Sequence, residues 1–348
     1  MLGMIRISLC STSGLTMAET FAQRRDRILQ TAKATEDKLP VRNADCRSRF
    51  WFQDGPTEYV YLFFHGFTAA PYQSEVMGKE LAKAGYTVLS PLMPGHGVAG
   101  EWSLENLPPL PEDAKVYQSF ALQWLEEAKQ LGKKVIVGGL SGGGTLSAWL
   151  ALNRSQDIYR VLLYAAYLSS SNRVIDLFIT KGKGGFCWDQ RVKKHRPGYN
   201  FFALPALATV LGMGTEVLKQ DAKGPCAPIF VISSESDRAV GNDDHRRLFE
   251  DVNAYQPLAW YLIFDRVNDV PHTMMVPSEG MDLAFLLTRL TRAFVESSAT
   301  WEDVRAIAHK LDRETTFDQA VQQLNLQDKV SGDMKTAMTM FDKRTLTS

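Results

Sequence analysis

Short apolar runs alternate with helical stretches along most of the chain, and this alternation constrains the possible fold more than any other feature. The runs are apolar throughout, which is typical of strands that are covered on both faces of a parallel sheet. Helical periodicity between them predicts an α/β fold with a mostly parallel, doubly wound sheet. The predicted strands are 59–64, 86–90, 134–138, 160–164, 229–233 and 259–264, and the predicted helices are 72–84, 112–131, 143–154, 243–251 and 279–296.

The spacing of these elements divides the chain into a core domain and additions. Residues 166–224 are too many for a simple crossover between two neighbouring strands, so we expect an inserted cap there. The core is then residues 41–296, with a first strand pair expected within 41–58, where the segment RSRFWFQ is one candidate.

Two helical extensions flank this core. An N-terminal extension occupies 1–40, with a helix expected after Met17, and a C-terminal extension occupies 297–348. In the C-terminal extension, apolar residues recur at helical spacing on two faces. They are Trp301, Val304, Ala308 and Leu311, and then Phe317, Val321 and Leu324.

Composition excludes several classes of protein. Lys and Arg number 39, as do Asp and Glu, and the resulting net charge of +0 argues against a nucleic-acid-binding protein. No apolar run approaches the roughly 18 residues of a membrane helix, and the N-terminus lacks the continuous apolar core of a secretory signal. We therefore expect a cytoplasmic protein. Its four cysteines form no CxxC pair and are predicted to be free thiols.

One motif carries chemistry. The predicted strand at 134–138 runs into Gly139-Leu140-Ser141-Gly142-Gly143, and a helical stretch follows. This is G-x-S-x-G between a strand and a helix, where a sharp turn lifts the serine hydroxyl clear of the sheet. The flanking glycines are needed because a Cβ there would collide with the strand or the helix. The helix N-terminus directs free N–H groups and a positive dipole at a developing oxyanion.

A serine at such a turn needs a base, and the base needs an orienting acid. Of the six histidines, His272 follows the last predicted strand and so lies at the same sheet edge as Ser141. Asp237 follows the strand at 229–233, and the order Ser, Asp, His is the one this motif requires. Asp265 and Asp269 compete for the acid role, but both lie too close to His272 along the chain to reach its ring easily.

Oxyanion donors are expected from two backbone amides. The strand at 59–64 leads into His65-Gly66-Phe67, where glycine lets the chain turn the next N–H inward. The donors are then the N–H groups of Phe67 and Gly142. We interpret His65 as a hydrogen-bonding brace of this loop rather than a catalytic group.

Together these segments resemble the α/β-hydrolase superfamily, and the chain is similar to bacterial carboxylesterases and monoacylglycerol-lipase-like hydrolases. The resemblance covers roughly residues 57–295. It implies a Ser141–Asp237–His272 triad, an oxyanion hole at Phe67 and Gly142, and a cap at 166–224. The motifs that carry it are HGF at 65–67, PGHG at 94–97, GLSGG at 139–143, SESD at 234–237 and His272.

Three other patterns have simpler interpretations. Residues 95–100 match G-x-G-x-x-G, but the proline-rich EWSLENLPPLP follows instead of a helix, so we expect a tight turn braced by His96 rather than a dinucleotide site. Asp243-Asp244-His245 is interpreted as a solvated helix start, because adjacent helical residues point about 100° apart and cannot converge on a metal. The glycine-rich 181–185 lacks phosphate-loop spacing and is expected to be a cap loop.

The sequence thus predicts a capped α/β-hydrolase acting as a serine esterase on a small-molecule acyl ester. Neither a metal nor an organic cofactor is expected. Three leucines of the cap are candidate acyl-binding residues: Leu204, Leu207 and Leu211. A thioesterase, an acyltransferase or a peptidase with the same triad remains an alternative. From a different class, so does a ligand-binding protein whose triad is idle.

Overall fold

The apolar runs of the sequence form one seven-stranded sheet. The computed structural model describes residues 19–188, 197–220, 224–276, 283–311 and 314–340. The strand order is β1-β3-β2-β4-β5-β8-β9; β1 is antiparallel to β3, and all other neighbours are parallel. The predicted mostly parallel sheet is therefore confirmed. The strands are β1 Arg49–Trp51, β2 Thr57–Phe64, β3 Thr87–Ser90, β4 Gly132–Leu140, β5 Arg160–Tyr164, β8 Ile229–Ser234 and β9 Trp260–Phe264.

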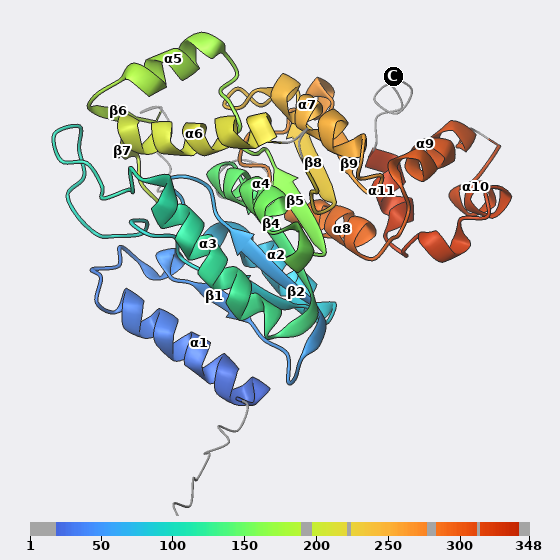
Figure 1. Cartoon of the computed structure of the whole chain (residues 1–348), viewed down its shortest axis with the longest axis horizontal. Helices are drawn as coiled ribbons and strands as arrows, with labels where there is room; N and C mark the ends of the chain where they lie inside the picture. Colours follow the sequence, from blue (N-terminus) through green and yellow to red (C-terminus); the bar gives the residue numbers. More distant parts are fainter. Residues whose placement is uncertain (1–18, 189–196, 221–223, 277–282, 312–313, 341–348) are drawn as a thin grey trace, which may run out of the picture.

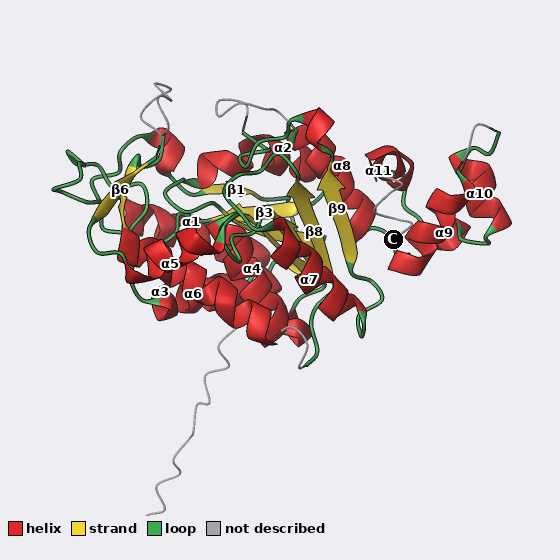
Figure 2. Ribbon diagram, turned by 90° about the horizontal axis from the view of Figure 1, so that it is seen from above, coloured by secondary structure: helices red, strands yellow, loops and turns green. Residues whose placement is uncertain are grey.

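Helices cover both faces of the sheet, which explains why its strands are apolar throughout. Figure 2 shows α2 (Glu75–Lys83) and α8 (Ala284–Val295) on one face. The opposite face carries α3 (Ala114–Lys129), α4 (Gly142–Asn153) and α7 (Asn242–Asn253). Short 3-10 turns connect several elements: Ala44–Cys46, Pro71–Ser74, Ser155–Asp157, Arg266–Asn268 and Gln327–Lys329.

The predicted N-terminal helix is α1 (Phe21–Glu36), and it lies along α3 (Figure 1). Thr20 caps its first turn by accepting a hydrogen bond from the Gln23 N–H. The guanidinium of Arg27 forms an ion pair with Glu127 of α3, with N–O distances of 2.6 and 2.8 Å. Ile28 is buried beneath the helix. These contacts attach α1 to the outer side of α3.

Between β5 and β8 the chain contains an additional segment. It consists of α5 (Arg173–Lys181), a small antiparallel pair of strands, β6 (Gly185–Cys187) and β7 (Phe201–Ala203), and α6 (Leu204–Gln220). Helix α6 packs across α4, the helix that follows Ser141. Residues 189–196 and 221–223 of this segment lie outside the described residues, and His195 is among them.

After α8 the chain forms α9 (Trp301–Lys310), α10 (Phe317–Gln323) and α11 (Met334–Met340). The indole N–H of Trp260 in β9 donates to the Ala299 carbonyl at 3.0 Å, and the Trp301 N–H donates to the Pro257 carbonyl at 2.8 Å. Asp333 forms an ion pair with Arg292 of α8 at 3.0 Å. The C-terminal helices are therefore anchored beside the last strand of the sheet.

Two details of the predicted elements need correction. Segment 41–58 holds only one strand, β1, before β2 begins at Thr57, because the chain turns at Asp54-Gly55-Pro56 and β1 pairs with β3 instead of with a second early strand. The predicted helix at 279–296 is described only from Ala284 onward. Cys46, Cys187 and Cys226 are free thiols, as predicted, and Cys10 lies outside the described residues. Within the described parts of the chain, no helix is both long and apolar enough to cross a membrane.

Candidate active site

Ser141 occupies a strained turn between β4 and α4. Its backbone has φ 55° and ψ −119°, in a region that residues with a Cβ rarely adopt. The Ser141 N–H donates to the Tyr164 carbonyl at 2.9 Å, and its own carbonyl accepts from the N–H groups of Thr145 and Tyr167, both at 3.0 Å. These bonds to β5, to α4 and to the chain after β5 hold the turn in its unusual conformation.

The two glycines that flank Ser141 in the motif are required by close backbone contacts. A Cβ on Gly139 would lie 2.3 Å from the carbonyl of Gly143, and a Cβ on Gly143 would lie 2.0 Å from the carbonyl oxygen of Phe64. Both distances are far below van der Waals contact. The strand-to-helix turn therefore excludes any larger residue at either position, as its sequence pattern predicts.

Asp237 and His272 form a hydrogen-bonded pair. The His272 Nδ1–H donates to Oδ2 of Asp237 at 2.7 Å, and the Ala239 N–H donates to the other carboxylate oxygen at 2.8 Å. The Asp237 side chain has no exposed surface, whereas the His272 side chain is 25% exposed. Burial alone would raise the pKa of Asp237, but the charge and hydrogen bond of His272 outweigh it and lower that pKa. Asp237 therefore stays ionised, and its bond to Nδ1 leaves Nε2 of His272 as the basic nitrogen.

Both competing carboxylates have other positions in the structure. Asp265 precedes the 3-10 turn Arg266–Asn268 and accepts a hydrogen bond from the Val267 N–H at 2.8 Å. Asp269 follows that turn in a left-handed conformation with φ 44°. Ser141, Asp237 and His272 follow β4, β8 and β9, whose carboxyl ends share one edge of the sheet, where ligands of such folds bind.

The two expected oxyanion donors lie next to each other. A Cβ on Gly142 would lie 3.3 Å from the amide nitrogen of Phe67, so the loop after β2 passes directly beside the first residue of α4. The N–H of Gly66 donates to Oε1 of Gln73 at 2.7 Å, which fixes this loop. The amide of Gly142 opens α4 and therefore lies at the positive end of the helix dipole.

Comparison with known proteins bears on the fold. A family described as "alpha/beta hydrolase fold" matches residues 59–220. A thermostable monoacylglycerol lipase of a Bacillus species is 37% identical over 102 residues, which cover 29% of this chain and only 38% of that lipase.

Two solved structures share the architecture. One, from work on two metagenome-derived lipolytic enzymes, has a TM-score of 0.59 at 16% identity and covers 73% of this chain and 98% of its own. The other, a monoacylglycerol lipase of Paleococcus ferrophilus, has a TM-score of 0.56 at 15% identity and covers 72% and 98%. The chain has the α/β-hydrolase fold.

Two buried histidines brace the loop after β2 in this α/β-hydrolase fold. His65 Nδ1–H donates to the Gly66 carbonyl at 3.0 Å, and its Nε2 accepts from the Met93 N–H at 3.1 Å. His96 Nδ1–H donates to the Pro94 carbonyl at 3.0 Å, and its Nε2 accepts from the Thr68 N–H at 3.3 Å. Burial lowers the pKa of both, that of His96 to about 4, so both stay neutral. This matches the interpretation of both residues as braces, and no helix follows the 95–100 turn before α3.

The interpretation of residues 243–245 as a solvated helix start is wrong. Asp244 is buried and forms an ion pair with Arg173 of α5 at 2.9 Å, and His245 is completely buried. His245 Nε2–H donates to the Ala166 carbonyl at 2.6 Å, and Nδ1 accepts from the Ser233 hydroxyl at 2.8 Å. It thus ties the end of β8 to the chain that follows β5. The sequence contained a signal for the burial of His245, because this residue stands four and seven residues before the buried Phe249 and Val252 on the same helical face.

A small cavity lies against Phe67 and Gly142, with a volume of about 10 Å³, the size of roughly one water molecule. Helix α6 contributes Val210 and Met213 to it. The proposed acyl-binding residues Leu204, Leu207 and Leu211 are buried on the same helix but are not among the residues that line this cavity. The remaining lining residues are Met93, His96, Tyr117 and Leu146.

The described residues hold no group of three or more His, Cys, Asp or Glu side chains placed to bind a metal ion.

Proposed function

We propose that the protein is a serine hydrolase that cleaves carboxylic esters of small molecules through an acyl-enzyme on Ser141. The observation that carries this proposal is the 2.7 Å contact between His272 and the buried Asp237, at the sheet edge where the turn presents Ser141. Similarity to lipases and esterases supports ester substrates in particular.

These positions support the following reaction. His272 Nε2 takes the Ser141 proton as Oγ attacks the acyl carbonyl, and Asp237 holds the ring in the required tautomer. The N–H groups of Phe67 and Gly142 stabilise the negative oxygen of the tetrahedral intermediate. The proton on His272 then passes to the leaving alcohol, which leaves the acyl group on Ser141. A water molecule, activated by the same histidine, hydrolyses this acyl-enzyme and restores the serine.

The test is Ser141→Ala, measured by turnover of p-nitrophenyl butyrate and by a thermal melt. Because alanine keeps the Cβ and loses only the hydroxyl, Tm should hardly change, whereas kcat should fall by roughly 10⁶. Ser147→Ala is the matched control: Ser147 lies in α4, where its hydroxyl donates to the Gly143 carbonyl at 2.9 Å. A folded Ser141→Ala variant with activity comparable to wild type would contradict the mechanism.

A fluorophosphonate probe separates catalysis from simple ligand binding, since only an activated serine reacts with it. We expect wild type and Ser147→Ala to be labelled and Ser141→Ala to remain unlabelled. Wild type that resists the probe and hydrolyses no ester, thioester or amide would favour the binding-protein alternative. Faster turnover of thioesters or amides than of esters would move the assignment to a thioesterase or a peptidase on the same triad.

A further inference from the structure

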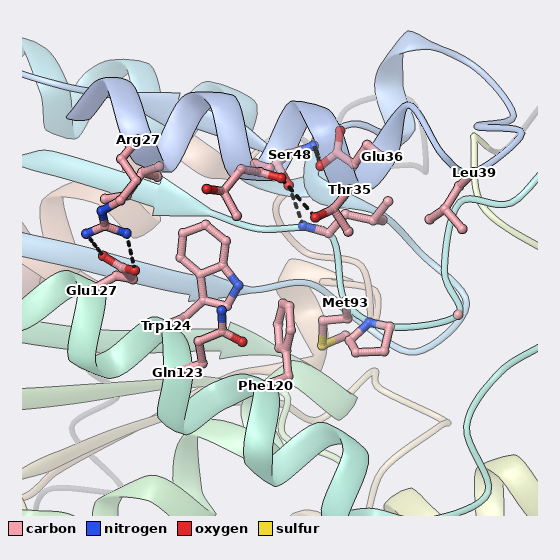
Figure 3. Close-up of a pocket in the computed structure, with 16 residues that line it drawn as sticks. Arg27, Thr35, Glu36, Leu39, Ser48, Met93, Phe120, Gln123, Trp124 and Glu127 are labelled. Carbon is pink, nitrogen blue, oxygen red and sulfur yellow. Dashed lines mark hydrogen bonds and ion pairs between the residues drawn. The ribbon is translucent and has the colours of Figure 1, made fainter. Parts of the chain in front are cut away.

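A second cavity lies away from Ser141, between α1 and α3 (Figure 3). Its volume is about 270 Å³. Its charged side chains are already engaged: Arg27 pairs with Glu127 at one end, and Glu36 accepts a hydrogen bond from the Ser48 N–H at 3.0 Å. The walls between these polar groups are largely carbon, and they include Ile28, Leu39, Leu92, Met93, Phe120 and Trp124.

This cavity and the small cavity beside Phe67 and Gly142 share a wall. Met93, which is 3% exposed, lines both of them. On the segment after β3, Pro94 and Gly95 line the α1–α3 cavity, whereas His96 lines the small one. The residues of α3 are likewise divided between the two cavities. Tyr117 lines the small cavity, and Phe120 and Trp124 line the large one.

The volumes of the two cavities indicate that the wall between them would control the length of the acyl chain that can bind. The small cavity, at about 10 Å³ beside the expected oxyanion hole, has room for roughly one water molecule and not for an acyl chain. The cavity behind it is larger than the apolar cavity of about 150 Å³ that holds a benzene ring, so by that measure it has room for roughly ten carbons. Methionine is unbranched and has three rotatable side-chain bonds, which makes it the side chain best able to move aside between them.

We propose that the α1–α3 cavity binds the distal part of a medium-length fatty acyl chain, and that Met93 opens the passage to it from Ser141. This inference rests on the proposed esterase function and names its substrate class. Because the charges around the cavity are paired with one another, an uncharged hydrocarbon chain is the ligand that best fits the space left between them.

The experiment fills the cavity from a position far from Ser141. Ala32 lines the cavity from α1, whereas Ala34 lies on the same helix, is exposed, and is absent from the lining. Wild type, Ala32→Trp and Ala34→Trp are compared by kcat/KM for p-nitrophenyl decanoate and acetate, each below its solubility limit. Thermal melts show whether α1 remains packed in each variant.

We expect the decanoate-to-acetate ratio to fall on the order of tenfold in Ala32→Trp, since each methylene kept from burial costs about fourfold in binding. The ratio should be unchanged in Ala34→Trp. Met93→Ala, which removes the dividing side chain, should raise the ratio and so tests the passage even if Ala32→Trp does not fold.

Three results would overturn the inference while leaving the esterase proposal standing. They are wild type that hydrolyses acetate but not decanoate, an equal fall in both tryptophan variants, and ratios that match wild type in Ala32→Trp and Met93→Ala. Wild type that hydrolyses neither ester would contradict the proposed function itself.

Discussion

Asp237 touches His272 with one carboxylate oxygen and the backbone of its own loop with the other. The contact to Nδ1 of His272 is 2.7 Å, and the contact from the Ala239 N–H is 2.8 Å. The carboxylate is therefore held by its own loop independently of the histidine. Because its own loop fixes the position of the Asp237 side chain, the charge of this side chain can be removed by substitution and tested separately from its position.

Replacing Asp237 with Asn should preserve the fold and remove most activity. The amide is nearly isosteric, but its NH₂ group can donate to Nδ1 and so favour the wrong tautomer of His272. By analogy with the worked serine-protease triad, kcat should fall on the order of 10⁴. The measurement is ester turnover together with a thermal melt.

Asp269→Asn serves as the control for this variant, because Asp269 lies on the same loop as His272 but is not the carboxylate bonded to it. Its kcat should stay near that of wild type. A large loss in Asp269→Asn with little loss in Asp237→Asn would make our acid assignment wrong.

Alanine should destabilise the protein far more at Gly143 than at Gly142. At Gly143 a Cβ would overlap the backbone oxygen of Phe64, at 2.0 Å, and β2 cannot move away without disturbing the sheet. Gly143→Ala should therefore lower the free energy of unfolding by about 3 kcal/mol or more.

At Gly142 the nearest atoms to a Cβ are 3.3 Å away, so Gly142→Ala should fold with a loss below about 1.5 kcal/mol. Urea unfolding of the two variants checks the contrast. Equal stability of the two variants would show that the turn relaxes more than the structure implies.

Replacing Tyr117 with Phe should stabilise the protein. The residue is 2% exposed, and its hydroxyl has no hydrogen-bond partner among the described residues. An unsatisfied buried hydroxyl costs about 1–3 kcal/mol, so Tyr117→Phe should raise the free energy of unfolding by roughly 1 kcal/mol. Urea unfolding measures the change.

Tyr164→Phe is the matched comparison, since the Tyr164 hydroxyl contacts Thr291 at 2.5 Å and Tyr61 at 3.2 Å. That variant should lose stability. If Tyr117→Phe also lost stability, its hydroxyl would have to have a partner in solution.

Acid should destabilise the protein partly through His96. Burial lowers the pKa of His96 to about 4 in the folded protein, against about 6.5 for an unfolded histidine. Between these values the unfolded chain binds more protons, so the free energy of unfolding falls as pH falls through this window. One such site contributes a slope of up to about 1.4 kcal/mol per pH unit.

Urea unfolding at pH 5 and pH 7 tests this slope. His96→Gln keeps one donor and one acceptor without titrating, so it should show a shallower dependence than wild type. His309, which is exposed on α9, provides the control: His309→Gln should leave the slope unchanged. Identical slopes in wild type and His96→Gln would rule out this contribution.

The geometry of the candidate site follows from local order in the sequence. Strand ends, a glycine-flanked serine and the order of Ser141, Asp237 and His272 can all be read from the residues. The contacts that were missed join distant segments, such as His245 with the carbonyl of Ala166. Which face of α6 would meet Gly142 depended on the angle at which α6 crosses α4, and periodicity alone does not contain that angle. For the same reason nothing in the sequence indicated the cavity between α1 and α3.

The backbone of Ser141 also limits which nucleophiles this scaffold can carry. A positive φ is tolerated with difficulty by any residue with a Cβ, and worst by a branched one. Cysteine has the unbranched β-carbon of serine, so a thiol can occupy the turn without a new steric cost. Threonine would add a methyl group at this strained turn. Replacement of the proposed nucleophile by a thiol is therefore compatible with this backbone, whereas a secondary alcohol at the same position is disfavoured by it.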